Sequence, residues 1–155
     1  MSDAKEALRA ELLAQLTEML ATARVAHASA VEGATHAEAK AENDKDTRGL
    51  EQSYIARGQA QRVLDLETAV HDVGAMALKA CATVAMSAVI SVEEEGATHR
   101  YFLAPHGGGN VLAGNVLVVT LSAPIGKALF GKRVDDEVEL KVGGKARTLT
   151  ILDVS

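Results

Sequence analysis

The sequence has little of several residue types that most folded domains use heavily. Its 155 residues include no tryptophan, two tyrosines, two phenylalanines and a single cysteine, Cys81, so no disulfide can form within the chain. Aromatic residues make up 3% of the chain, whereas 48% of it is hydrophobic and much of that share is alanine. Because alanine buries little surface, this composition favours closely packed helices over a bulky globular core. Cys81 lies in an apolar run and is interpreted as a small buried core residue.

Clusters of basic residues and long apolar runs are also missing. The formal net charge is −5, which argues against direct binding of nucleic acid, because neutralising phosphates requires clustered Lys and Arg. No uninterrupted apolar run is long enough to span a bilayer, so we expect no contact with a membrane. Residues 1–6 lack the basic and apolar regions of a signal peptide. These absences together predict a cytoplasmic protein.

Proline is absent from the first 104 residues, because the two prolines are Pro105 and Pro124. Such a stretch permits long helices, and residues 3 to about 42 consist mainly of strong helix formers. Within them, apolar or small residues recur at alternating spacings of four and three, the heptad pattern of a packed helix pair. These seam positions are Leu12, Leu16, Met19, Ala23, Ala26, Ala30, Gly33 and Ala37. The seam predicts a helix roughly 60 Å long, which a partner helix approaches most closely near its far end.

The helical pattern breaks at residues 43–47, which are turn and N-cap residue types. A second helix is predicted from about residue 47 to residue 73. Its apolar positions are Leu50, Tyr54, Ala56, Ala60, Val63, Leu66, Val70 and Val73. A short connection between two long helices predicts an antiparallel hairpin, which we assign to residues 1–76.

From about residue 80 the pattern changes, and residues 77–155 are assigned to a small antiparallel β domain with one short helix. Strand-prone runs are expected at residues 83–92, 101–103, 116–121, 138–142 and 145–154, the last two joined at Gly143-Gly144. A short helix is predicted between them, with Ser122 as its N-cap, Pro124 in its first turn and Gly131 just past its end. The fold class is therefore α+β.

The turn of the hairpin is acidic. Five carboxylates gather around it: Glu38, Glu42, Asp44, Asp46 and Glu51. One interpretation is that they cap helices and keep the turn soluble. The second is that some of them are presented to a divalent ion in another molecule, because Mg²⁺ favours carboxylate oxygens and seldom receives a complete cage from one protein.

The sequence contains no pattern of a self-contained active site. The run from His106 to Gly109 is similar to the oxyanion loop of esterases, but no G-x-S-x-G nucleophile motif accompanies it, so we interpret it as a flexible loop. The five histidines show no metal-ligand spacing.

One C-terminal segment is specific to a family. Residues 122–132 read Ser-Ala-Pro-Ile-Gly-Lys-Ala-Leu-Phe-Gly-Lys and are followed by an acidic step at residues 135–137. This segment resembles the S-P-[IL]-[GA]-x-x-L-[IL]-G-K element of the GreA/GreB family of bacterial transcript-cleavage factors. Residues 42–48, 54–62 and 150–154 are also similar to that family, so the resemblance extends over nearly the whole chain.

The resemblance implies an antiparallel coiled coil followed by an FKBP-like β domain. The β domain would dock on bacterial RNA polymerase through the element that contains Ser122, Pro124, Ile125, Leu129, Phe130 and Lys132. The coiled coil would enter the secondary channel, where Glu42, Asp44 and Asp46 would act in trans, with Glu42 and Asp44 as ligands of the second catalytic Mg²⁺ of the polymerase. The protein would then be a monomeric accessory factor that is not itself an enzyme and has no cofactor of its own.

The chain also departs from the family pattern. The family's cleavage loop reads G-D-L-x-E-N, but here Ala39 stands three residues before Glu42, and Glu38 is one residue further back. The sequence therefore leaves open whether cleavage is stimulated or the channel is merely occupied by an inhibitor. Two hypotheses from different classes are an FKBP-like prolyl isomerase or chaperone, and a coiled coil that dimerises.

Overall fold

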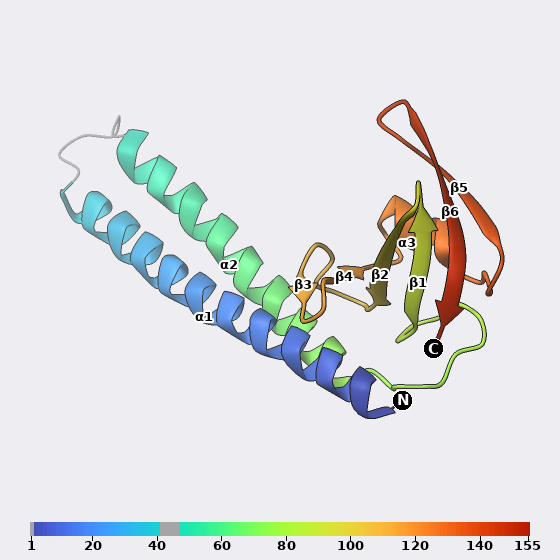
Figure 1. Ribbon diagram of the computed structural model, residues 1–155. Helices are drawn as coiled ribbons and strands as arrows, with labels where there is room; N and C mark the ends of the chain where they lie inside the picture. Colours follow the sequence, from blue (N-terminus) through green and yellow to red (C-terminus); the bar gives the residue numbers. More distant parts are fainter. Residues whose placement is uncertain (1, 41–46) are drawn as a thin grey trace. The chain divides into compact units, whose positions relative to one another are not determined.

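The computed structural model describes residues 2–40 and 47–155, with side chains described outside residues 36–49. Two helices come first, α1 (Ser2–Lys40) and α2 (Thr47–Ala75), as predicted (Figure 1). The six strands and one short helix that follow are β1 (Val89–Glu94), β2 (Ala97–Leu103), β3 (Val111–Leu112), β4 (Val116–Val119), α3 (Pro124–Leu129), β5 (Glu137–Val142) and β6 (Lys145–Val154). None of the described helices is long and apolar enough to cross a membrane.

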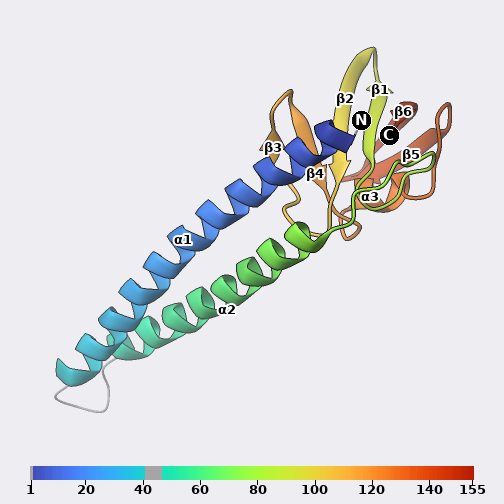
Figure 2. The ribbon, with the colours of Figure 1, turned by 90° about the horizontal axis from the view of Figure 1, so that it is seen from below.

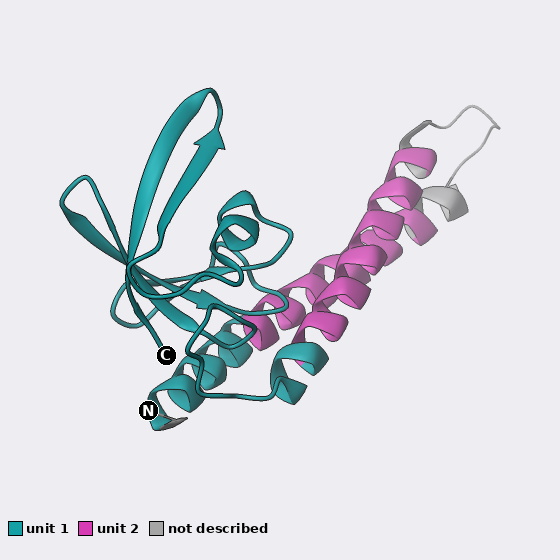
Figure 3. Cartoon of the chain, turned by 90° about the vertical axis from the view of Figure 1, so that its right-hand side faces the viewer, with its two compact units in different colours: residues 1–15, 71–155 teal, residues 16–70 magenta. Residues whose placement is uncertain are grey.

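The chain divides into two compact units (Figure 3). Residues 16–70 form one unit, which contains most of both long helices. Residues 1–15 and 71–155 form the second, in which the start of α1 and the end of α2 belong with the sheet. The division predicted from the sequence, after residue 76, follows the end of α2 instead.

In the helical unit, α1 and α2 run side by side in opposite directions (Figures 1 and 2). Arg24 forms an ion pair with Glu67 at 3.6 Å, and a Cβ at Gly33 would lie 3.0 Å from Oε1 of Gln52. A later residue of α1 is therefore paired with an earlier residue of α2. The predicted antiparallel arrangement is confirmed for the residues that the structure describes.

The seam of α1 follows the predicted heptads with one systematic shift. Leu16, Ala23 and Ala30 are buried as predicted, but Leu20 and Ala34 are more deeply buried than their predicted neighbours Met19 and Gly33. A straight α-helix has 3.6 residues per turn, so the packed face drifts by about 20° per heptad from a strict seven-residue repeat. The buried positions of α1 are therefore spaced slightly further apart than a strict heptad predicts.

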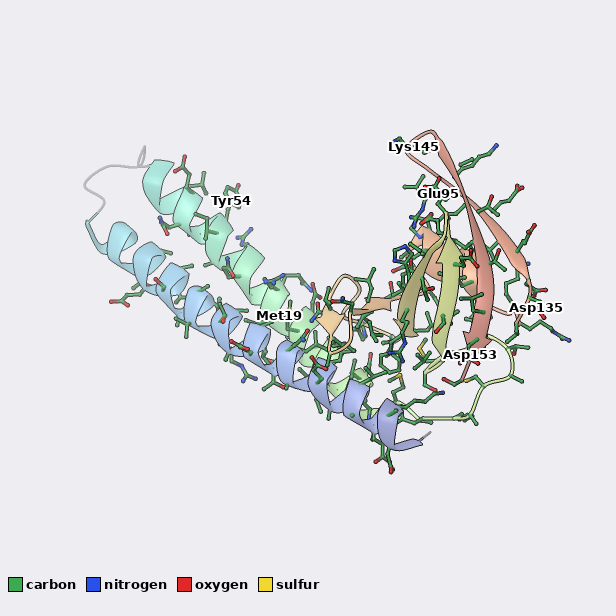
Figure 4. All side chains as sticks on the ribbon, in the orientation of Figure 1. Met19, Tyr54, Glu95, Asp135, Lys145 and Asp153 are labelled. Carbon is green, nitrogen blue, oxygen red and sulfur yellow. The ribbon has the colours of Figure 1, made fainter. Side chains whose placement is uncertain are left out.

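The prediction for α2 is wrong at its beginning. Leu50 and Tyr54 were placed on the packed face, but they are 55% and 59% exposed, whereas Leu66 and Ala69 are buried. Figure 4 shows Tyr54 on the side of α2 that faces away from α1. The guanidinium of Arg57 lies 5.8 Å from the centre of its ring, a cation–π contact on the helix surface.

The sheet has the strand order β3-β4-β2-β1-β6-β5. Its pairs are antiparallel, as predicted, except β2–β4, which is parallel and makes the sheet mixed. The parallel pair requires a connection that returns to the start of β2, and residues 104–115 provide it. The β5–β6 hairpin turns at Gly143 and Gly144, both with positive φ, as predicted.

The segment before β1 differs from the prediction. Residues 83–92 were expected to be extended, but the strand begins at Val89, and Thr83 forms only an isolated bridge with Arg133. The main core lies between the sheet and α3. Its buried members are Val84, Ala88, Ile90, Val92, Tyr101, Leu103, Val119, Leu129, Val138, Leu149 and Ile151. Cys81 is half-buried at the edge of this core rather than inside it.

The start of α1 is fixed to the β part of its unit by polar contacts and one close approach. The Arg9 guanidinium donates to the carbonyl of Met76 at 2.7 Å, and the Glu11 carboxylate accepts from the amide of Ala113 at 2.9 Å. Gly107 has a φ of 87°, and a Cβ there would lie 2.7 Å from a methyl group of Leu12. The glycine-rich loop therefore packs closely against α1 and is not the flexible connection that the sequence suggested.

Candidate partner-binding surface

The short helix α3 begins and ends where the sequence places its signals, except at its N-cap. Pro124 occupies the first turn, and Gly131, just past the end, has a φ of 81°. The N-cap is Ala123 and makes no side-chain cap, so the prediction of Ser122 as N-cap is wrong. Instead, the Ser122 hydroxyl pairs with the hydroxyl of Thr120 at 2.9 Å, which leaves it on the surface before the helix.

Gly126 fixes α3 against the end of β4. A Cβ at this position would lie 1.9 Å from the carbonyl oxygen of Thr120, much closer than any real contact. The helix backbone can therefore approach the preceding turn only because residue 126 has no side chain. This contact gives a physical reason for a glycine in the Pro-Ile-Gly segment, where a helix would otherwise favour alanine.

The turn after α3 is held by backbone hydrogen bonds. The amide of Gly131 donates to the carbonyl of Val84 at 2.8 Å, and the amide of Val84 donates to the carbonyl of Lys132 at 2.7 Å. The Asp136 carboxylate accepts from the amide of Arg133 at 2.9 Å. Asp135, which Figure 4 labels in this turn, has a φ of 72°. Residues 131–136 therefore form a defined surface rather than a loose loop.

The predicted docking residues divide into exposed and buried ones. Leu129 is 1% exposed and belongs to the core, and Ile125 is half-buried against it, so both support the surface from below. The exposed ones are Ser122, Pro124, Phe130 and Lys132, and Phe130 is 50% exposed. Val134, 42% exposed, was missed by sequence reasoning, although an apolar residue within a charged turn was a usable signal. We call Ser122, Pro124, Phe130, Lys132 and Val134 the α3 surface.

Charges of both signs surround the α3 surface. Lys127, Lys132 and Arg133 are all exposed here, and none of them forms an ion pair with another described residue. Residues 135–137, Asp-Asp-Glu, follow directly in the sequence and bring three carboxylates. An exposed phenylalanine beside unpaired cations suits a partner surface that combines an apolar contact with acidic groups.

The acidic turn predicted around residues 38–51 is described only in part. Glu42, Asp44 and Asp46 fall outside the described residues, as does the side chain of Glu38, whereas Glu51 is exposed at the start of α2. Within residues 2–40 and 47–155, no group of three or more His, Cys, Asp or Glu side chains is placed to hold a metal ion. The assignment of tip carboxylates as metal ligands in trans therefore stays a prediction.

A charged pair on the sheet has a structural role. The Arg147 guanidinium on β6 donates to both carboxylate oxygens of Glu94 on β1, at 2.6 and 2.8 Å. These hydrogen bonds hold the pKa of Glu94 below its usual value and raise that of Arg147, while burial raises the pKa of Tyr101 next to them. All three groups keep their ordinary charge at neutral pH, so the cluster joins neighbouring strands and offers no proton for catalysis.

Comparison with known proteins gives a family match and several distant structures. Residues 79–155 match the family described as "Transcription elongation factor, GreA/GreB, C-term". No curated protein matches the sequence. Among solved structures, the chain is similar to GreA factor homolog 1 (Gfh1) of Thermus thermophilus, with 16% identity, coverage of 92% of this chain and 94% of that chain, and a TM-score of 0.41. Gfh1 of Thermus aquaticus is 17% identical, with coverage of 90% of this chain and 91% of that chain and a TM-score of 0.42. A prokaryotic transcription elongation factor GreA/GreB of Nitrosomonas europaea is 24% identical, with coverage of 63% of this chain and 79% of that chain and a TM-score of 0.38. These identities and scores are low, so the family assignment rests on residues 79–155.

Proposed function

Because the chain belongs to the GreA/GreB family of transcription elongation factors through residues 79–155, we propose that it binds bacterial RNA polymerase and inserts its helical hairpin into the secondary channel. There it would stimulate hydrolysis of backtracked RNA by the active site of the polymerase. The protein would act as an accessory factor without an active site of its own.

The observation that carries the proposal is that the matched residues include the complete α3 surface. Its exposed side chains lie on a helix whose position Gly126 fixes, and they are followed by a turn that backbone hydrogen bonds hold. A surface organised in this way loses little conformational entropy when a partner covers it. Phe130 would supply the apolar contact, and Lys132 and its neighbouring cations would face acidic groups of the polymerase.

The helical hairpin is long enough to extend into a channel. The α1 segment Leu16–Lys40 alone spans roughly 35 Å at 1.5 Å per residue, long enough to carry a turn into a channel. At that turn Glu42 and Asp44, with Asp46, would donate carboxylate oxygens to a Mg²⁺ that the polymerase holds incompletely. The ion would then activate a water molecule for attack on the RNA phosphodiester, and the free RNA end would be shortened.

A second candidate function is inhibition by occupying the channel. The sequence favours it at one position, because Ala39 stands where the family's cleavage loop has an acidic residue. A hairpin that enters the channel without a competent carboxylate pair would block it and leave the RNA intact.

A prolyl isomerase and a dimerising coiled coil have less support. A prolyl isomerase or peptide-binding domain needs an aromatic pocket, but Tyr101 and Phe102 are 5% and 0% exposed and are therefore inaccessible to a peptide. A dimerising coiled coil would leave its seam open to a second chain. In the described part of the helical unit, the seam of α1 is covered by α2 of the same chain, which supports a monomer.

The experiment that tests the proposal adds the protein to stalled, backtracked polymerase complexes and follows the length of the RNA. Stimulated cleavage gives shortened RNA that grows again when nucleotides are supplied. An inhibitor gives intact RNA together with competition against a cleavage factor. Absence of any binding to polymerase would refute both functions.

A further inference from the structure

A cavity of about 380 Å³ opens beside the end of β6, and none of its lining residues belongs to the α3 surface. Its wall is formed by residues 78–82 together with Lys5, Val154 and Ser155, and all of its lining residues belong to the unit that Figure 3 draws in teal. The volume is within the range of small-molecule sites in proteins. Most of the wall is apolar, and no acidic side chain lines it.

The cation in this wall is unusually buried. Lys5 is the fourth residue of α1 and is only 5% exposed, although lysine is almost never fully buried without a partner. Its ammonium group donates to the carbonyl oxygen of Lys79 and lies 3.8 Å from the sulfur of Cys81. The thiol of Cys81 donates to the same carbonyl at 3.3 Å.

These partners satisfy hydrogen bonds but leave the charge of Lys5 unbalanced. An ammonium group has three donors, and a carbonyl and a thiol bring no negative charge to it. Among the residues that the structure describes, no carboxylate lies within ion-pair distance of Lys5. Removing a charge from water is costly unless an opposite charge compensates it. The cavity therefore presents one buried positive charge at the edge of an apolar space.

We infer that this cavity binds a small aliphatic carboxylate, with the carboxylate on Lys5 and the hydrocarbon chain against Leu78, Ala80 and Val154. The carboxylate supplies the missing negative charge, and the chain removes apolar wall from water. A charge-assisted hydrogen bond of this kind is stronger than a neutral one. A cationic ligand with the same chain is excluded by repulsion, and an alcohol lacks the charge that Lys5 requires.

The single cysteine of the chain can report on binding in this cavity. Cys81 is the only cysteine, so a thiol reagent that carries no charge reacts at this cavity and nowhere else in the protein. Hexanoate is the probe, and 1-hexanol and hexylamine are the matched ligands of equal chain length. We expect hexanoate to slow the alkylation of Cys81 in a saturable manner, hexanol to slow it only weakly, and hexylamine to have no effect.

Two lysine variants separate the charge of Lys5 from charge in general. Lys5→Met keeps the length of the side chain but removes the ammonium group, so hexanoate should bind about tenfold or more weakly. Lys141→Met removes an exposed positive charge on β5 that does not line the cavity, and it should bind hexanoate like the parent. Protection is scored in each variant as the ratio of alkylation rates with and without ligand, because Lys5→Met also changes the rate itself.

The outcomes are decisive. Equal protection by hexanoate in Lys5→Met and the parent would overturn the inference, as would equal protection by hexylamine or no saturable protection at all. If Lys5→Met does not fold by circular dichroism, the comparison of the three ligands in the parent still decides the question.

Discussion

Asp72, near the end of α2, and His106, in the loop after β2, form a hydrogen-bonded pair with 2.8 Å between Oδ2 and Nε2. The second carboxylate oxygen of Asp72 lies 3.3 Å from Nδ1 of His71, so the carboxylate lies between two imidazoles. These hydrogen bonds, that with His106 first, lower the pKa of Asp72 from its ordinary value of 3.8. The pair joins the last turns of α2 to the glycine-rich loop within one compact unit.

The first prediction concerns pH. Because the pKa of Asp72 is lower in the folded than in the unfolded chain, folding favours its ionised form. Its contribution to stability is complete above pH 3.8 and is lost as the pH falls through the lowered value. Asp72→Asn should therefore melt at a lower temperature than the parent at neutral pH, and the difference should shrink in acid. Melting curves from about pH 6 downward test this, and His71→Gln is the control, with a smaller expected loss because His71 is mostly exposed.

A second prediction concerns the position of α3. Gly126→Ala should destabilise the β unit by about 3 kcal/mol or more, because the new methyl group would overlap the carbonyl of Thr120. Gly58→Ala is the matched control. A Cβ at Gly58 meets nothing within 4 Å, so alanine should stabilise α2 by about 1 kcal/mol. Denaturant unfolding measures both, and equal effects of the two changes would mean that Gly126 does not need its close approach.

The hairpin seam gives a third prediction. Ala30 is 8% exposed, so Ala30→Leu should overpack the contact with α2 and cost roughly 1–3 kcal/mol. Ala28→Leu, on the exposed side of the same helix, should change stability little. Ala26 is only half-buried, so Ala26→Leu should cost less than Ala30→Leu. Thermal melts that fail to separate the Ala30 and Ala28 variants would show that the packed face is assigned incorrectly.

Much of this architecture follows from local signals in the sequence. The absence of proline before residue 105 and the repeated four-three spacing suffice for two long helices. The alternation of residues 138–142 with Gly143-Gly144 suffices for the last hairpin. The two-residue strand β3 is too short to show a period, and the parallel pairing of β2 with β4 depends on the path of the chain, so neither was predictable.

The candidate surface was predictable in position but not in orientation. Leu129 and Phe130 are adjacent apolar residues, yet one is in the core and the other is half exposed. Leu129 packs into the core, whereas Phe130 is the C-cap residue of α3, and residue type alone does not distinguish the two. On α2, Leu50 and Tyr54 fit an apolar stripe by type, although the packed face lies elsewhere on the helix.

A fourth prediction tests docking. Phe130→Asp should leave the fold intact, since the side chain is half exposed, and should weaken binding to polymerase about tenfold or more, as expected for a central aromatic contact. Leu152→Asp changes a residue of similar exposure on β6 and should bind like the parent. Leu129→Asp would unfold the core and cannot serve as a docking test. Titration of each variant against labelled polymerase gives the affinities, and an unchanged affinity for folded Phe130→Asp would remove Phe130 from the interface.

The most direct test of the central claim replaces the carboxylates of the hairpin turn. In the proposed mechanism, replacing Glu42, Asp44 and Asp46 by alanine should abolish stimulated cleavage of backtracked RNA, while binding to polymerase persists because docking is assigned to the α3 surface. Excess Mg²⁺ should partly restore cleavage if the carboxylates recruit that ion. The measurement is the length of the RNA in stalled complexes with the parent and the triple variant, each at equal occupancy. Shortened RNA with the parent alone is the predicted result, and a parent that binds polymerase but leaves the RNA intact at every Mg²⁺ concentration would contradict it.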